Sequence, residues 1–403
     1  MRTVLVTGPG GAGRSTVAAA TALAAAANGG RTLLISAEAI PGFPAATEPT
    51  RVTGLLDHAR IDSGEHFRAE LTELQKRASG VLDLLGAGRL DGEELTELPG
   101  SPQLALLHTL RRAAEGDWSG YDTLVVDLPP LTEALALLAL PEQLRRYLRR
   151  LLPAERQAAR ALRPVLAQLA GVPMPAQWLY EAAARKDAEL AAVQALIEDG
   201  STTLRLVAEP GPAAEDALRT ARTGLALHGL RADLLIASRV LPRHSSDPWF
   251  AALAAQQEKC LDHWHQDVAP DVPVHEAAHL GRDPQGPDDL AALEVPAPDD
   301  RTPGRAPDPW WTEEEQDAEG GGTTLTWCLP LPGAAKEDLR LVRRGDELLL
   351  TVGPFHRIVR IASALRRCTV SGAALADGVL RVRFTPDPAL WPRTSGSDAG
   401  PFG

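Results

Sequence analysis

The sequence is poor in cysteine and in long hydrophobic runs. Its three cysteines, Cys260, Cys328 and Cys368, are an odd number and lie far apart in the chain. This pattern fits isolated, reduced thiols better than a disulfide framework. The longest apolar run, VAAATALAAAA, is shorter than the ~20 residues of a membrane-spanning helix. The opening MRTVLVTGPGG has no apolar core followed by a cleavage site, as a signal peptide would. We therefore expect a cytoplasmic protein with no integral membrane segment.

Positive charge is also scarce. The chain holds 41 lysines and arginines against 53 acidic residues, a formal charge of -12 at pH 7. This balance disfavours a general binder of nucleic acid or of anionic membranes, so we expect no nucleic-acid partner. The lysines are Lys76, Lys186, Lys259 and Lys336, and the other basic residues are arginines. With the abundant alanine and proline, this bias indicates a genome-wide codon preference.

Five aliphatic runs predict the strands of a buried sheet. They cover residues 3–7, 31–36, 121–130, 202–210 and 232–240, and helix-forming segments separate them. Continuous β-branched and aliphatic runs are typical of parallel strands that are buried on both faces. The fold class that we predict is therefore α/β, with a doubly wound, mostly parallel sheet whose ligands bind outside the carboxyl ends of the strands.

The 403 residues are enough for two domains, because single cores stop growing at roughly 250–300 residues. We assign residues 1–295 to the α/β domain, with a helical insert at about 131–200, where apolar residues recur at three- and four-residue spacing. Residues 296–322, rich in proline, glycine and acid, predict a linker. Alternating residues in 323–386 predict a small antiparallel all-β domain, and 387–403 a disordered tail.

Glycines crowd the turn that follows the first predicted strand, in the segment GPGGAGRST at 8–16. In a phosphate-binding loop, glycines let backbone N–H groups converge on phosphate oxygens, and the next helix adds its positive N-terminal dipole. Gly8, Gly10, Gly11 and Gly13 provide that room. A tight turn of structural value alone is the alternative, but the flanking strand and helix favour nucleotide binding.

Arg14, Ser15 and Thr16 complete the loop. Such loops usually carry lysine where Arg14 stands, and the hydroxyl at the position of Ser15 usually ligates Mg²⁺. Asp127 ends the strand TLVVD and suits the second, acidic partner of that ion, although a strand-end cap is the alternative role. We therefore predict ATP and Mg²⁺ as cofactors, with Ser15 and Asp127 on the metal.

The doubled-glycine loop, the segment VVDLPPLTEALALLALPEQL and the strand LLIASRVLP together resemble the ArsA family. This family contains the arsenite-pump ATPases and the factors that target tail-anchored membrane proteins, and the resemblance covers roughly residues 1–295. It implies a P-loop NTPase of the deviant Walker A type, acting as a dimer on a protein or ion partner. In the family loop G-K-G-G-x-G-K-[ST]-T, the first lysine reaches the partner's nucleotide. Here Pro9 replaces that lysine and Arg14 replaces the second.

Two further positions depart from the family pattern. Glu38 stands where an aspartate positions the attacking water, and a misplacement of ~1 Å can cost ~10²-fold in rate. Ser238 replaces the asparagine that contacts the adenine edge, and one hydroxyl cannot make the paired contacts of an amide. The resemblance still assigns Glu38 and Asp127 to catalysis and Ser238 to the nucleotide. We expect nucleotide binding at best weakened and hydrolysis slow or absent.

The metal and client sites of the family are not evident in this sequence. The family's C-x-x-C pair has no counterpart in LPRHSSDPWF, and the cysteines form no cluster that would bind arsenite. Cys260, His263 and His265 lie near one another but lack a fourth ligand, so we disfavour a metal there. Methionine occurs only at Met1 and Met174, which gives no methionine-rich groove for a membrane helix.

The C-terminal segment resembles the small heat-shock, Hsp20-like domain. The resemblance rests on LPLPGAAKEDLRLVRRGDELLLTVG and AALADGVLRVRF, within residues 323–386. It implies a β sandwich, and such sandwiches bind partners by strand addition at their edges.

We therefore predict an ATPase-like protein that couples ATP and Mg²⁺ to the handling of a protein or ion partner. The alternative is a pseudo-ATPase scaffold whose nucleotide site is degraded at Pro9, Arg14, Glu38 and Ser238. Either a homodimer or a heterodimer with a related, intact ATPase fits these residues. A positioning ATPase of the ParA/MinD kind is disfavoured, because the crossing lysine and a basic or amphipathic anchor are missing.

Overall fold

The chain divides into two compact units, residues 1–217 with 231–305, and residues 218–230 with 306–403. The computed structural model describes residues 1–77, 79, 90–152, 177–268, 272–299, 309–316, 323–387 and 389–390. Parts of the predicted helical insert, linker and tail lie outside these described residues.

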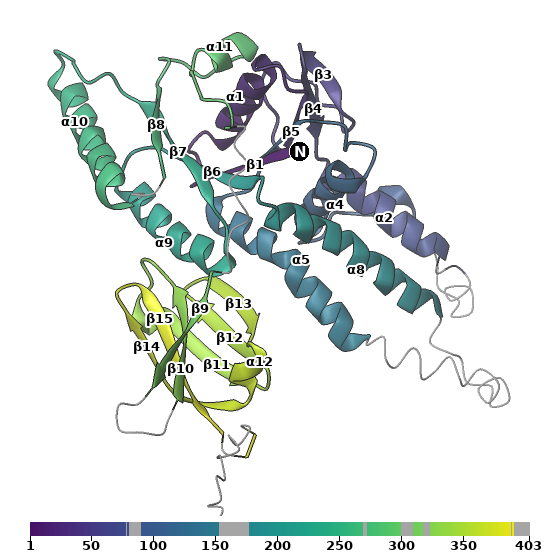
Figure 1. Cartoon of the computed structure of the whole chain (residues 1–403). Helices are drawn as coiled ribbons and strands as arrows, with labels where there is room; N and C mark the ends of the chain where they lie inside the picture. The colour runs from purple at the N-terminus through teal and green to yellow at the C-terminus, as the bar shows by residue number, and fades with distance from the viewer. Residues whose placement is uncertain are drawn as a thin grey trace, which may run out of the picture. The chain divides into compact units, whose positions relative to one another are not determined.

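The first unit is built on an eight-stranded sheet with the order β3-β4-β2-β5-β1-β6-β7-β8 (Figure 1). All neighbouring strands are parallel except β3 and β4. This arrangement confirms the predicted doubly wound, mostly parallel sheet. The strands are β1 (Arg2–Thr7), β2 (Thr32–Ser36), β3 (Thr50–Thr53), β4 (Leu56–Arg60), β5 (Thr123–Asp127), β6 (Thr202–Ala208), β7 (Ala232–Val240) and β8 (Val274–Ala278).

The central strands are buried because helices cover the sheet. β1 lies between β5 and β6, and its residues Val4 and Val6 are fully buried. Helix α1 (Arg14–Ala27) packs on this part of the sheet through alanines such as Ala18 and Ala22, which are fully buried. Alanine is a strong helix former, and its small side chain allows a close approach of helix to sheet. The packing fixes the start of α1 beside the ends of β1 and β5.

Four helices lie side by side at one end of the sheet (Figure 1): α2 (Ser63–Arg77), α4 (Ser101–Glu115), α5 (Leu131–Leu151) and α8 (Gln177–Glu198). The predicted insert at about 131–200 thus contains α5 and α8, while residues 153–176 are outside the described part of the chain. The other helical segments that the structure describes in this unit are α9 (Pro212–His228), which the unit boundary divides, α10 (Pro248–His263), α11 (Pro287–Ala291), a 3₁₀ turn (Gly92–Glu94) and a π turn (Trp264–Val268).

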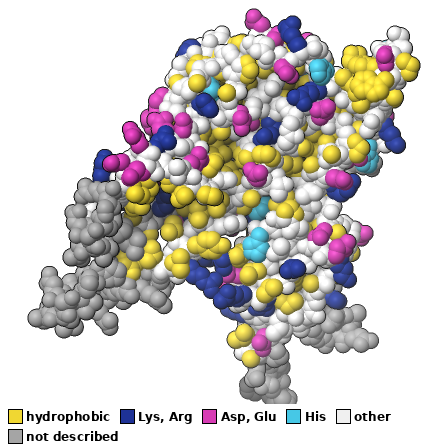
Figure 2. Space-filling model, turned by 180° about the vertical axis from the view of Figure 1, so that it is seen from behind, with side chains coloured by type: hydrophobic (Ala, Val, Ile, Leu, Met, Phe, Trp, Pro, Cys, Tyr) yellow, Lys and Arg dark blue, Asp and Glu magenta, His cyan; other side chains and the backbone are white. Residues whose placement is uncertain are grey.

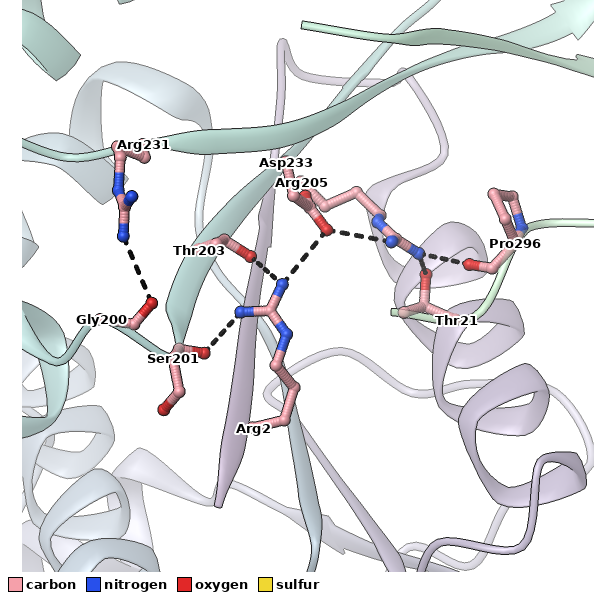
Figure 3. A network of polar contacts seen from close by, with 9 residues as sticks. All are labelled: Arg2, Thr21, Gly200, Ser201, Thr203, Arg205, Arg231, Asp233 and Pro296. Carbon is pink, nitrogen blue, oxygen red and sulfur yellow. Dashed lines mark hydrogen bonds and ion pairs between the residues drawn. The ribbon is translucent and has the colours of Figure 1, made fainter. Parts of the chain in front are cut away.

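A buried ionic network fastens the amino ends of the central strands (Figure 3). Arg205 on β6, only 2 % exposed, donates to Asp233 on β7 at 3.0 Å, to Thr21 of α1 at 3.1 Å and to the carbonyl of Pro296 at 2.7 Å. Arg2 on β1 lies 3.7 Å from the same carboxylate oxygen of Asp233. One carboxylate therefore contacts two guanidinium groups that come from two different strands.

The second unit contains an antiparallel four-stranded sheet and an antiparallel three-stranded sheet, as an Hsp20-like domain requires. The sheets have the strand orders β14-β15-β10-β9 and β11-β12-β13. The strands are β9 (Trp311–Gln316), β10 (Thr323–Pro330), β11 (Leu339–Arg344), β12 (Glu347–Val352), β13 (Phe355–Arg360), β14 (Cys368–Ala376) and β15 (Val379–Pro386), with a short helix α12 (Ser363–Arg366) and a 3₁₀ turn (Lys336–Asp338).

Strand β9 lies inside the segment that the sequence predicts as linker, 296–322. It pairs with β10, from Trp311 opposite Cys328 to Gln316 opposite Thr323. The preceding Trp310 packs its ring 6.2 Å from that of Trp327. The acidic sequence WTEEEQ does not by itself predict a strand. The segment is a strand because β10 supplies the partners for its backbone hydrogen bonds.

The three cysteines all lie in the described part of the chain, are buried and form no disulfide. Burial raises the pKa of the Cys260 thiol to about 12, with Glu215 adding to the effect. Among the residues that the structure describes, no helix combines the length and apolar character needed to cross a bilayer. Acidic and basic side chains are interspersed over the face of the protein seen in Figure 2.

Candidate functional site

The glycine loop connects β1 to α1 and has the backbone of a tight turn. Gly11 and Gly13 have φ angles of 80° and 81°, which side chains with a Cβ rarely adopt. At Gly8 an added Cβ would lie 1.8 Å from the carbonyl oxygen of Val207 on β6. The fold itself therefore requires glycine at Gly8, Gly11 and Gly13.

Gly10 differs from these three glycines. Its φ lies outside the left-handed region, and an added Cβ would meet nothing within 4 Å. The residue is exposed at the tip of the loop. No contact inside the protein accounts for a missing side chain at this position, whereas the close approach of a ligand to the backbone would.

Ser15 and Asp127 meet at the start of α1. The hydroxyl of Ser15 donates to Oδ2 of Asp127 at 2.6 Å. β5 carries Asp127 at its carboxyl end, and its parallel pairing with β1 sets Val6 opposite Asp127. The two residues that the sequence assigns to Mg²⁺ are therefore in direct contact, although they are far apart in the chain. Thr16 follows in the first turn of α1 and is half-buried.

Burial raises the pKa of Asp127 to about 6, because the ionised carboxylate loses its hydration. The hydrogen bond from Ser15 and the charge of Arg14 oppose this effect, and the charge of Glu38 adds to it. The second oxygen, Oδ1, is buried and has no hydrogen-bond partner among the residues that the structure describes. A buried, unpaired carboxylate oxygen next to a hydroxyl is a donor set that suits a hard divalent cation.

Arg14 turns toward β5. Its Nη1 atom donates to the carbonyl oxygen of Leu128, the residue after Asp127, and its Nε is buried with no partner in the described part of the chain. Arginine occupies the position of the loop lysine, but part of its guanidinium hydrogen-bonding capacity is directed at the backbone of the neighbouring segment. This placement reduces what Arg14 can offer to a phosphate.

Glu38 follows the end of β2 and is exposed. Its backbone is held by Ser36, whose hydroxyl lies 2.9 Å from the carbonyl oxygen of Glu38 and 2.9 Å from Nε2 of His58. Burial lowers the pKa of His58, so the ring is neutral at pH 7. The segment that carries Glu38 is thus fixed, while its carboxylate stays in contact with solvent.

Ser238 lies on the opposite side of the loop. Its buried hydroxyl donates to the carbonyl oxygen of Ala12 at 2.7 Å. The next residue, Arg239, has a φ of 55° and donates to the carbonyl of Gly11 at 2.8 Å. Both side chains therefore support the backbone of the loop, and the single proton of Ser238 is not directed toward a nucleotide base.

Two cavities flank the loop. The first, of about 300 Å³, is lined by Arg14, Glu38 and Asp127, by the segment 128–130, and by the first turns of α2, α4 and α5. The second, of about 390 Å³, is lined by Arg239 and by residues from the ends of β6, β7 and β8 and from α10, including Glu209, Gln257 and His279. Both lie at the carboxyl ends of the strands, where ligands bind in doubly wound sheets.

Arg239, Leu128 and Pro129 contribute to the site although the sequence analysis assigned them no role. The carbonyl oxygen of Pro129 accepts a hydrogen bond at 2.8 Å from Thr7, which ends β1. These contacts use backbone carbonyls, so residue type gives little signal of them. For Arg239, its position directly after Ser238 is the one signal that the sequence offers.

Family comparison agrees with this geometry. Residues 1–294 match the model of the anion-transporting ATPase family, ArsA, and residues 322–384 match an HSP20-like domain found in ArsA. The chain belongs to the ArsA ATPase family. The predicted resemblance is therefore confirmed for both parts of the chain.

Three relatives align with nearly the whole chain. An uncharacterised protein of Streptomyces coelicolor is 56% identical over 98% of this chain and 100% of its own length. A protein of Mycobacterium tuberculosis is 32% identical over 97% of both chains. A putative arsenical pump-driving ATPase of Aquifex aeolicus is 24% identical, over 91% of this chain and 95% of its own. These three alignments therefore extend over both parts of this chain.

Proposed function

We propose that the first unit binds ATP with Mg²⁺ at the loop 8–16 and hydrolyses it slowly, coupling the nucleotide state to a protein or ion partner. The observation that carries this proposal is Gly10, whose missing side chain has no explanation within the fold. In this proposal, the phosphates lie on the backbone N–H groups of Gly10, Gly11 and Gly13 and of the first turn of α1.

The chemistry of Ser15 and Asp127 fits Mg²⁺. Hard divalent ions bind hydroxyl and carboxylate oxygens, and Oδ1 of Asp127 is buried without a partner among the described residues. A bound Mg²⁺ would supply positive charge to neutralise the phosphate oxygens. The raised pKa of Asp127, at about 6, still leaves it ionised and able to act as a ligand at pH 7.5.

Slow hydrolysis follows from Arg14 and Glu38. One N–H group of Arg14 donates to the Leu128 carbonyl and is not available to a phosphate. A planar guanidinium also does not substitute for the compact ammonium of lysine in such a site. Glu38 is the candidate group for holding the attacking water, but its carboxylate is exposed and one methylene longer than the family's aspartate. A misplacement of ~1 Å can cost ~10²-fold in rate.

We further propose that the protein acts in the cytoplasm as a dimer, with itself or with a related ATPase, and that the Hsp20-like unit recruits a protein client. The replacement of the crossing lysine by Pro9 favours a related subunit that supplies this charge. Arsenite is disfavoured as the ion, because the three cysteines are buried and carried by α10, β10 and β14, without a cluster of thiols. Affinity purification from the native cell tests the partner: recovery of this chain alone would exclude the heterodimer.

Equilibrium binding of ATP, with and without Mg²⁺, is the experiment that tests the nucleotide proposal. We expect the purified full chain to bind Mg²⁺-ATP by calorimetry and to release phosphate slowly. Gly10→Ala should lower ATP affinity at least ~10-fold with an unchanged thermal midpoint, because no protein atom contests the new methyl group. Gly92→Ala, at another exposed glycine whose added Cβ meets nothing within 4 Å, is the matched control.

The second candidate function is a pseudo-ATPase scaffold. Two hydrogen bonds favour it: Arg14 donates to the carbonyl of Leu128, and Ser238 donates to the carbonyl of Ala12. Both side chains thus stabilise the loop and are not directed at a nucleotide. A chain that binds no ATP at millimolar concentration would support the scaffold and overturn the nucleotide proposal.

A further inference from the structure

Two histidines and a glutamate meet between α2 and α4, outside the loop and its catalytic candidates. His66 and Glu70 lie one turn apart on α2, and His108 lies on α4. One nitrogen of each imidazole and one carboxylate oxygen of Glu70 all lie within 4.8 Å of one another. The two imidazole rings are in contact, with centroids 4.6 Å apart and planes tilted by 39°.

The spacing on α2 sets this arrangement. Residues four apart in a helix point to the same face, so His66 and Glu70 form a pair, and α4 packs against this face. Both histidines are half-buried, whereas Glu70 is exposed. The cluster therefore opens to solvent on the side of its carboxylate and is shielded on the side of its rings.

Ordinary helix packing explains this cluster poorly. Two polar imidazole rings in contact add little hydrophobic stabilisation to a helix interface. A proton on either ring also disfavours a proton on the other. Burial is the largest cause that lowers the pKa of both His66 and His108. For His108, the neighbouring His66, Arg111 on its own helix and Lys186 on α8 lower it further, while Glu70 raises the pKa of both rings. Neutral imidazole is the form of histidine that binds metals.

We propose that His66, Glu70 and His108 form a binding site for Zn²⁺ that joins α2 to α4. Two imidazoles and one carboxylate are a ligand set that Zn²⁺ takes with a fourth position left to water. Zinc bonds of about 2.0–2.1 Å place tetrahedral ligand atoms about 3.3 Å apart, so side-chain rotations must close the present separations by about 1.5 Å or less. The nearby cation Lys186 is paired with Glu189 at 3.0 Å, which offsets its charge.

The site would act on the cavity beside the loop. Ser63, at the start of α2, and Leu106 on α4 line that cavity. His66 lies one turn beyond Ser63, and His108 lies two residues beyond Leu106. A metal held by both helices would therefore fix the distance between two walls of the cavity that contains Arg14 and Asp127.

Metal titration of the full chain, without an affinity tag and stripped of metal, tests this proposal independently of ATP. We expect one Zn²⁺ to bind by calorimetry, and Co²⁺ to give the intense visible bands of a tetrahedral site. His66→Gln and His108→Gln should each weaken Zn²⁺ binding at least ~10-fold and abolish the Co²⁺ bands. His244→Gln, at an exposed histidine, is the matched control.

Glu70→Gln is a second test variant in which the fold should be retained, because Glu70 is exposed and its replacement leaves the helix packing intact. It should also weaken Zn²⁺ and reduce the rise of the thermal midpoint that Zn²⁺ causes in the wild type. The proposal is overturned if His108→Gln binds Zn²⁺ as the wild type does, if Co²⁺ shows only weak octahedral absorption, or if His244→Gln loses as much affinity as His66→Gln.

Discussion

The hydroxyl of Ser238 donates to the carbonyl oxygen of Ala12 at 2.7 Å, joining the end of β7 to the glycine loop. Both residues are buried. Arg239 adds a second bond from the same strand to Gly11. The loop is therefore held from β7 by its own protein, and the position where the family has an adenine-contacting asparagine serves loop structure here.

Removal of the Ser238 hydroxyl should destabilise the loop. We expect Ser238→Ala to lower the free energy of unfolding by about 1–3 kcal/mol, because the buried carbonyl of Ala12 loses its partner. Urea unfolding measures this change. Ser246→Ala, at an exposed serine in the following loop, is the control and should change the free energy by less than ~0.5 kcal/mol. Equal effects of both substitutions would contradict the anchoring role.

Restoring the family's lysine should raise turnover. We expect Arg14→Lys to speed phosphate release about tenfold, or about 1.4 kcal/mol of barrier, because a compact ammonium frees the Leu128 carbonyl and can point at the phosphates. Steady-state phosphate release measures the rate. Arg239→Lys makes the same exchange beside Gly11 and should not accelerate release. A slower Arg14→Lys variant would show that arginine itself is the better phosphate ligand in this loop.

Asp127 should make stability depend on pH. Its folded pKa of about 6 lies above the ordinary value of 3.8, so the folded state keeps a proton that the unfolded state has released between these values. The protonated Asp127 therefore adds to the free energy of unfolding below about pH 4, and this contribution is lost as the pH rises through about 6. Asp127→Asn should abolish this loss and raise the free energy of unfolding at pH 7.5 by on the order of 2 kcal/mol.

Urea unfolding at pH 4.5 and pH 7.5 checks the sign for Asp127, with the exposed Asp262→Asn as the control. The same substitution should remove the Mg²⁺ dependence of ATP affinity, because a neutral amide is a poorer ligand for a hard cation. An Asp127→Asn variant that is less stable than the wild type at pH 7.5 would mean that the ionised carboxylate is the favoured form in the fold.

Asp233 should be among the costliest acidic residues to replace. We expect Asp233→Asn to destabilise the first unit by about 3–5 kcal/mol, because Arg2 and Arg205 would lose the one carboxylate that both of them contact (Figure 3). Thermal unfolding measures the loss. Asp262→Asn serves again as the exposed control. A double variant that also replaces Arg205 by methionine should recover part of the stability, and no recovery would contradict the charge argument.

The sequence predicted the features that are local in the chain. Continuous aliphatic runs identified β1, β2, β5, β6 and β7, and glycine spacing identified the loop. It did not predict β4, whose sequence LDHAR places Asp57 and His58 in the buried sheet. Arg51 and Tyr121 hydrogen-bond to Asp57, and Ser36 and the carbonyl of Pro44 hydrogen-bond to His58. No local sequence pattern reveals these partners.

The candidate site shows the same limit. Ser15 and Asp127 were predicted as a pair because each stands in a motif, and they are in contact. Arg239 was missed, because its contact with Gly11 depends on a left-handed backbone at the end of β7. His66 and His108 belong to two helices, α2 and α4, and nothing in either helix alone indicates that they meet.

The buried network at the amino ends of the strands also sets an order of events during synthesis. Arg2 leaves the ribosome first, but its acceptor Ser201 follows 199 residues later, and the Pro296 carbonyl that receives Arg205 comes 91 residues after that arginine. β1, which leads into the glycine loop, lies between two strands made long after it. β1 therefore stays without its sheet neighbours until β5 and β6 have been made, and the bond from Ser238 to Ala12 in the glycine loop forms only after a further 226 residues have left the ribosome.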